Sequence, residues 1–263
     1  MEQRSPAAYV AEFLGTFLLV FVVTMVVVLF VTPAGGGGSE WVVVGLVHAF
    51  VLFLIVQSLG SISGAHVNPA VTLSLLAIRK IRPNDAVVYI LLQLSGAVAG
   101  ALMTKFILND RIAEGPFAQT PGAVGAQASA EVGTPSLNEI LLGGTFPGFV
   151  LEALGAFFLV WAICAVAVNP RAARDWAGLA IGSTLGFLVM IGGPLTGGSF
   201  NPARFFGPAL VANAWTDWWL YILAPAVGAV LGAFVYWYLF VESRIGGRAA
   251  PGAGPTGLRQ DAP

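Results

Sequence analysis

Long apolar runs alternate with short polar stretches along this chain. A helix needs about 20 mainly apolar residues to cross a bilayer. Six stretches are long enough: 7–31, 41–60, 85–108, 147–168, 177–194 and 217–241. Two shorter apolar segments remain, 69–78 and 202–212. Ten residues of helix span only about half of a hydrocarbon core of ~30 Å. We therefore expect both short segments to enter the membrane without crossing it, with irregular backbone facing protein or water.

Composition supports a membrane protein. Of the 263 residues, 57% are hydrophobic and 10% are charged, whereas soluble domains carry about 25% charged residues. The net charge of −1 and the absence of a long basic run argue against nucleic acid as a partner. Two histidines and the single Cys164 are too few for most metal sites, so we expect no metal and no cofactor. The apolar run that starts at Phe13 exceeds the about 7–15 residues of a signal-peptide core, which favours a first membrane span.

The two halves of the chain repeat. Residues 11–15 (AEFLG) resemble residues 151–155 (LEALG), and glycines recur at matching places in the third and sixth spans. Each half contains three spans and one short segment, and an odd number of spans gives the halves opposite orientations. The predicted fold is therefore an all-α membrane protein with six transmembrane helices and two re-entrant half-helices in an inverted repeat.

We expect one membrane domain over residues 1–245. It comprises repeat one (about 7–108), an outer loop (about 109–146) and repeat two (about 147–241). The Gly/Pro-rich residues 246–263 are expected to form a disordered cytoplasmic tail.

Lys and Arg predict the orientation. With a cytoplasmic N-terminus, nine of the twelve fall inside: Arg4, Arg79, Lys80, Arg82, Arg171, Arg174, Arg244, Arg248 and Arg259. Only Lys105, Arg111 and Arg204 fall towards the outside. This asymmetry follows the positive-inside rule. We expect a multi-pass protein of the cell membrane with both termini in the cytoplasm.

The motif Asn-Pro-Ala occurs twice, at residues 68–70 (Asn68, Pro69, Ala70) and at residues 201–203 (Asn201, Pro202, Ala203). Asn is a preferred N-cap and Pro suits the first helical position, so both boxes predict helix starts. If each Asn caps its helix through its oxygen, we expect its NH2 group to stay free as a donor to water. The positive ends of the two half-helices disfavour cations and protons there.

The residues before each box are expected to line the same path. The glycines Gly64, Gly197 and Gly198 allow an extended backbone whose carbonyls form a ladder of acceptors. The predicted pore-lining backbone comprises Gly64, Ala65, His66, Gly197 and Ser199. His66 is expected to shape the inner loop or vestibule.

The stretches SGAHVNPAVT (63–72) and GSFNPAR (198–204) resemble the signature boxes of the aquaporin, or major intrinsic protein, family. The resemblance extends over about residues 7–241. It implies a right-handed helical bundle, a passive channel, and a homotetramer with one pore per subunit. It also implies that Arg204 is the fixed cation of an outer selectivity filter, completed by His48, Val189 and Gly198 at matching spacings.

This predicted filter departs from the usual water-channel pattern at three of four positions. Val189 and Gly198 are smaller than the usual side chains, which predicts a wider aperture. The set is similar to that of plant vacuolar-membrane aquaporins, so we expect water, with ammonia or other small neutral solutes as further candidates. A glycerol or small-polyol facilitator is the alternative. Such proteins present an aromatic corner where this chain has His48 and Gly198, but Ile222 resembles their pattern.

Glu12 and Glu152 lie inside apolar spans, where a carboxylate costs about 2.5–3.5 kcal/mol or more. They would serve as a proton relay in a coupled secondary transporter. The resemblance instead implies a structural role, with each accepting hydrogen bonds from re-entrant backbone. The sequence offers no nucleophile–base set for an enzyme. A junctional, adhesive role stays open. The expected partners are water, small neutral solutes and membrane lipid.

Overall fold

The computed structural model describes residues 4–31, 39–108 and 132–242, and the expected tail 246–263 lies outside these ranges. The helices are α1 (Pro6–Val26), α2 (Glu40–Leu59), α3 (Pro69–Ala77), α4 (Pro83–Leu108), α7 (Glu139–Leu142), α8 (Thr145–Ile163), α9 (Ala177–Thr196), α10 (Pro202–Ala212) and α11 (Trp218–Tyr236). Helices α1, α8 and α11 continue into π-helical turns, namely η1 (Val27–Val31), η2 (Cys164–Val168) and η4 (Trp237–Glu242). A short 3₁₀ turn, η3 (Arg174–Trp176), precedes α9.

Six helical segments are long and apolar enough to cross a membrane. Their ends agree with the predicted spans within three residues, and the described ranges contain no strand. The third span starts at Pro83, two residues earlier than expected, because proline suits the first helical position. The prediction of an all-α membrane fold is confirmed.

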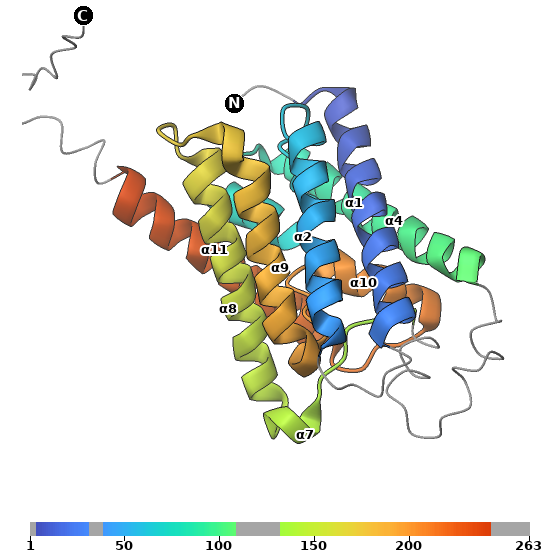
Figure 1. Cartoon of the computed structure of the whole chain (residues 1–263). Coiled ribbons are helices and arrows are strands. Elements are labelled where there is room, and N and C mark those ends of the chain that lie inside the picture. Colours follow the sequence, from blue (N-terminus) through green and yellow to red (C-terminus); the bar gives the residue numbers. More distant parts are fainter. Residues whose placement is uncertain (1–3, 32–38, 109–131, 243–263) are drawn as a thin grey trace, which may run out of the picture.

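The two short segments form the half-helices α3 and α10. Both are capped by the asparagine of their Asn-Pro-Ala box. Counted from the N-terminus, α1, α2, α3 and α4 have the same order as α8, α9, α10 and α11, so each half contributes three spans and one half-helix. Figure 1 shows α1, α2, α8 and α9 side by side, with the start of α1 at one end of the bundle and α7 at the other.

Glycines hold three pairs of spans close together. A Cβ atom at Gly96 or Gly100 of α4 would overlap backbone oxygens of α1, and one at Gly228 or Gly232 of α11 would overlap those of α8. Gly182 of α9 approaches α2 in the same way. The first two pairs lie within the halves, whereas α2 and α9 join one half to the other. Small residues at four-residue spacing permit such approach.

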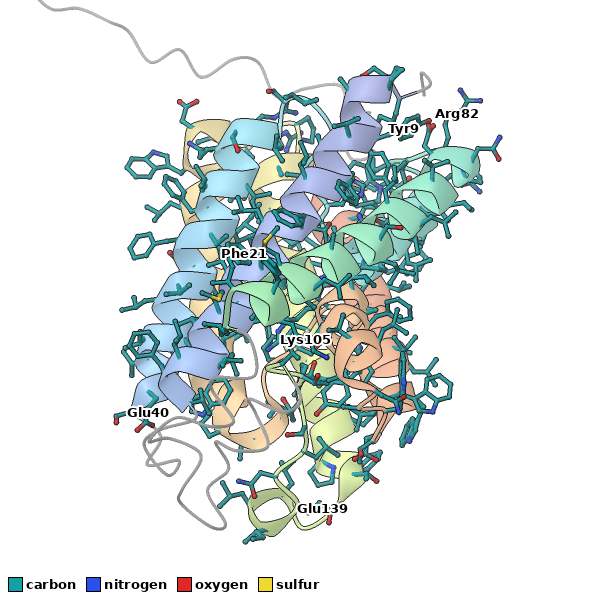
Figure 2. All side chains as sticks on the ribbon, turned by 90° about the vertical axis from the view of Figure 1, so that its right-hand side faces the viewer. Tyr9, Phe21, Glu40, Arg82, Lys105 and Glu139 are labelled. Carbon is teal, nitrogen blue, oxygen red and sulfur yellow. The ribbon has the colours of Figure 1, made fainter. Side chains whose placement is uncertain are left out.

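The end of the outer connection folds back onto the second half. The expected loop 109–146 contains a short helix, α7, that the sequence did not predict. The Asn138 side chain donates to the Pro194 carbonyl (3.3 Å), and the Asn138 backbone N–H donates to the Leu195 carbonyl (2.8 Å). Figure 2 places Glu139 at the opposite end of the bundle from Tyr9 and Arg82. Residues 132–138 therefore cover the turn that leads into the second box.

Candidate pore

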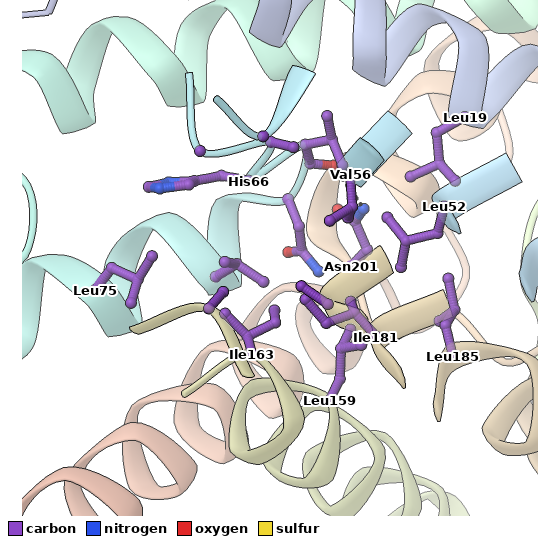
Figure 3. Close-up of a pocket in the computed structure, with 18 of the residues that line it drawn as sticks. Leu19, Leu52, Val56, His66, Leu75, Leu159, Ile163, Ile181, Leu185 and Asn201 are labelled. Atoms are coloured by element: carbon purple, nitrogen blue, oxygen red, sulfur yellow. Dashed lines mark hydrogen bonds between the residues drawn. The ribbon is translucent and has the colours of Figure 1, made fainter. Parts of the chain in front are cut away.

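A cavity of about 590 Å³ lies between the two halves. Most of its wall is aliphatic and comes from α1, α2, α3, α8 and α9: Leu19, Val23, Leu52, Val56, Val71, Leu75, Leu159, Ile163, Ile181 and Leu185. The polar part of the wall includes both box asparagines, both histidines and Arg204. Figure 3 shows Asn201 among apolar side chains from both halves. Such a wall offers a few polar groups along an otherwise apolar path.

The two asparagines cap their own helices and also bind each other's loops. Asn68 Oδ1 accepts from the N–H of Ala70 (2.8 Å), and Asn201 Oδ1 accepts from that of Ala203 (2.9 Å). Asn68 Nδ2 donates to the Phe200 carbonyl and Asn201 Nδ2 to the Val67 carbonyl, both at 3.0 Å. The expectation of a wholly free NH2 group therefore needs correction. One N–H of each amide joins the boxes, and one is left for the cavity.

The loops before the boxes are not extended, contrary to expectation. Their backbones turn through left-handed conformations at matching positions, with φ of 94° and 75° at Gly64 and Gly197. Val67 (φ 42°) and Phe200 (φ 51°) also have positive φ, although neither is glycine. Such conformations cost about 1–3 kcal/mol each. The turns direct successive backbone N–H groups towards one buried carboxylate, which offsets that cost.

Glu12 and Glu152 are the carboxylates that hold these turns, and both are fully buried. Glu12 accepts from Ser63 Oγ (2.6 Å) and from the N–H groups of His66 (3.0 Å) and Val67 (2.8 Å). Glu152 accepts from equivalent donors: Thr196 Oγ1 (2.6 Å), Ser199 N (2.9 Å) and Phe200 N (2.6 Å). These contacts fit the structural role expected of the glutamates rather than a proton relay.

Two of the four predicted filter residues line the cavity. His48 Nδ1 lies 2.8 Å from the Val44 carbonyl. Because a carbonyl only accepts, Nδ1 carries the proton, and Nε2 has no partner among the described residues. Arg204 Nη1 donates to the Gly133 carbonyl (2.9 Å), while its Nε is likewise unpaired in the described chain. The structure thus brings a potential acceptor and a cationic donor to one cavity.

The other two filter residues lie next to each other but not in this wall. Val189 has no exposed surface and packs in the core beside α2. A Cβ atom at Gly198 would lie 3.4 Å from Val189 Cα. The wider aperture expected from these small residues stays a prediction.

Several residues that build the site were missed by the sequence analysis. Tyr89 and Tyr221 donate to the carbonyls of Ser63 and Thr196, both at 2.8 Å. Gln93 Nε2 donates to Glu12 Oε2 (2.8 Å). The polar side chains stand out within apolar spans, so their position was a usable signal. The Gly133 carbonyl carried no such signal, because any residue has one.

A family model described as "Major intrinsic protein" matches residues 2–236. The chain belongs to the major intrinsic protein family. This is a family of channels, and membership agrees with the six apolar spans: the chain is an integral, multi-pass membrane protein.

Named members of the family are similar over most of their length. "Glycerol uptake facilitator protein-like 6" of Lactiplantibacillus plantarum is 38% identical over 228 residues, covering 86% of this chain and 94% of that protein. "Probable aquaporin AqpM" of Archaeoglobus fulgidus is 36% identical over 260 residues, covering 89% and 97%. The X-ray structure of the aquaglyceroporin from Plasmodium falciparum has a TM-score of 0.69 at 24% identity, covering 88% and 94%. That structural likeness supports the major intrinsic protein fold.

Proposed function

We propose that this member of the major intrinsic protein family is a passive channel for water, with ammonia as a second substrate, and that it excludes protons and ions. One observation carries the proposal. A single cavity has a mostly aliphatic wall, one available N–H at each box asparagine, and Arg204 with His48 in the same wall. Water can exchange hydrogen bonds with these few groups, while a cation meets Arg204 and the positive ends of α3 and α10.

Glycerol transport is the second candidate, and the name of the similar Lactiplantibacillus plantarum protein favours it. The predicted filter argues in the other direction. A polyol presents carbon atoms to one side of a narrow path, and an aromatic corner would accommodate them. His48 and Gly198 occupy the positions where facilitators present that corner, so we rank glycerol below water.

The proposed assembly is a homotetramer in the cell membrane, with residues 1–245 as one domain and both termini in the cytoplasm. Large apolar side chains are exposed on all six spans, among them Leu14, Phe50, Leu91, Phe158, Phe187 and Leu231. Lipid and neighbouring subunits would cover these surfaces.

Osmotic shrinkage of proteoliposomes, followed by light scattering, tests the function. A channel predicts shrinkage much faster than in empty liposomes, with a low activation energy and no need for a pH gradient. Parallel assays with glycerol and ammonia gradients rank the substrates. Water permeability equal to that of empty liposomes would contradict the proposal, and glycerol flux comparable to water flux would favour the second candidate.

A further inference from the structure

Three cations line the cavity at the end next to the N-terminus. Arg4 precedes α1, Lys80 follows α3, and Arg174 lies in η3 before α9. Together with Ala177 at the start of α9, they are called the N-terminal mouth. No Asp or Glu is among the described residues of the cavity wall. The three positive charges therefore face the lumen without an acid in the same wall.

The end of α3 holds Lys80 in place. Arg79 adopts a left-handed φ of 59°, and the Lys80 N–H donates to the Leu75 carbonyl (2.7 Å). Lys80 Nζ then lies 3.5 Å from the centre of the Trp237 ring. Partial burial lowers the pKa of the Lys80 ammonium from its ordinary value, while the nearby Cys164 and Glu242 act in the opposite direction. An ammonium group that has lost part of its hydration is stabilised when an additional anion binds close to it.

The start of α9 places the positive end of a helix dipole at the mouth. This helix has 20 residues, and its N-cap Trp176 supplies no side-chain hydrogen bond. Ala177 lies in the cavity wall, and Arg174 lies three residues earlier. The Ala177 N–H already donates to the Arg174 carbonyl, so this helix attracts an anion through the positive end of its dipole. A side-chain cation and a helix terminus thus face the same space.

The positive-inside rule explains why this end of the bundle is positively charged. It does not explain why three of the cations lie in the cavity wall. Arg79, Arg82 and Arg171 lie on the same connections, satisfy the rule equally, and are not in the cavity wall. The orientation of the protein in the membrane does not by itself require three cations around the lumen. The three cations nevertheless lie in one cavity wall, although they come from three separate parts of the chain.

We propose that the N-terminal mouth binds a phosphate dianion, either free or on a lipid headgroup, and that the bound anion obstructs the pore. The binding stands on the mouth alone, whereas the obstruction rests on the proposed channel function. A multivalent anion can contact cations from several elements at once, whereas chloride satisfies one at a time. Because each charged hydrogen bond stabilises the bound anion, losing one cation should weaken binding at least about tenfold.

The binding experiment titrates inorganic phosphate into the purified full chain by calorimetry, at constant ionic strength set with sodium chloride. We expect saturable binding that Arg174→Gln, Lys80→Gln and Arg4→Gln each weaken at least about tenfold. Arg171→Gln, three residues from Arg174 but outside the wall, is the matched control and should leave binding unchanged. In a second arm the protein is incorporated into vesicles containing phosphatidylinositol phosphate.

The possible outcomes distinguish a free anion from a lipid headgroup, and they distinguish anion binding from obstruction of the pore. Binding of inorganic phosphate supports a free anion, and binding only to the phosphoinositide vesicles supports a headgroup. Absence of both, or equal weakening by Arg171→Gln, overturns the site. In the shrinkage assay, anion on both faces should lower water permeability at least about twofold in the wild type and less in Arg174→Gln. Binding without that decrease overturns the obstruction. If the protein shows no water permeability even before anion is added, that result contradicts the channel proposal and leaves the binding proposal intact.

Discussion

At the scale of single residues, the predicted filter is held by backbone rather than by other side chains. Arg204 binds the Gly133 carbonyl and His48 binds the Val44 carbonyl. His48 Nε2 and Arg204 Nε have no hydrogen-bond partner among the described residues, and both side chains belong to the cavity wall. Removing either side chain should therefore change which solutes and ions pass through the cavity.

Replacing Arg204 with Val should admit protons or small cations, because the fixed positive charge disappears from the cavity wall. Proteoliposomes loaded with a pH-sensitive dye measure the proton leak in a pH gradient. Arg171→Val removes an equivalent charge outside the cavity and should leave the leak at the wild-type level. An unchanged proton leak in Arg204→Val, with water flux retained, would mean that the half-helix dipoles are sufficient to exclude protons without Arg204.

At the scale of elements, the two re-entrant loops are built alike but are not equal. Glu12 accepts a further bond from Gln93, and Gln93 also donates to Thr72 Oγ1 (3.0 Å). Tyr89 and Tyr221 are 132 positions apart (221 − 89), and the same shift carries Gln93 to Pro225, which has no donor. Among the described residues, the Glu12 carboxylate therefore has one more hydrogen-bond donor than the Glu152 carboxylate.

Replacing Gln93 with Leu should lower the free energy of unfolding by about 1.5–3 kcal/mol, because the buried Glu12 carboxylate loses a donor. Thermal unfolding in detergent measures the change. Ser95→Ala on the same helix removes only an exposed hydroxyl that binds the Leu91 carbonyl, and should have little effect. Equal stability of Gln93→Leu and wild type would show that water replaces the amide.

Close helix contact gives a second prediction at this scale. A methyl group at Gly228 would overlap the Ala153 carbonyl, so Gly228→Ala should force α8 and α11 apart. Overpacking of this kind costs about 1–3 kcal/mol. The neighbouring Val227 is exposed on the same helix, and Val227→Leu provides the control. Thermal melts in which both variants match wild type would contradict the assigned contact.

Helix positions were readable from the sequence, whereas the loop conformations were not. Spans and half-helices follow from apolar length and from Asn-Pro starts, which are local signals. The left-handed turns at Val67 and Phe200 depend on carboxylates about 50 residues away, and residue type alone disfavours such turns. The contact between Gly133 and Arg204 depends on a carbonyl, which every residue has. Both features arise from tertiary structure.

At the scale of the whole molecule, charge and chain ends indicate one orientation. Arg82 lies at the same end of the bundle as Tyr9, and Glu139 lies at the other (Figure 2). An N-terminus in the cytoplasm follows if the positive-inside rule holds.

Cysteine labelling tests that orientation. In a Cys164→Ser background, which removes the buried thiol, single cysteines are placed by Glu139→Cys and Arg171→Cys at two exposed positions. A membrane-impermeant maleimide added to intact cells should label the first and not the second, and lysis should expose both. The reverse pattern would place the N-terminus outside.

The crossed bonds between Asn68 and Phe200 and between Asn201 and Val67 have a consequence for synthesis. Among the described residues, the hydrogen-bond donors to Glu12 all lie in the first half, so the first loop can form while the second is still being translated. Asn68 of the first loop cannot reach its acceptor, the Phe200 carbonyl, until 132 more residues have been added. At about 5–20 residues per second, that is a wait of roughly 7–26 s. We therefore expect the two loops to dock late in biogenesis, and a nascent chain that stalls after α4 to hold a formed first loop whose Asn68 Nδ2 lacks its acceptor from the second half.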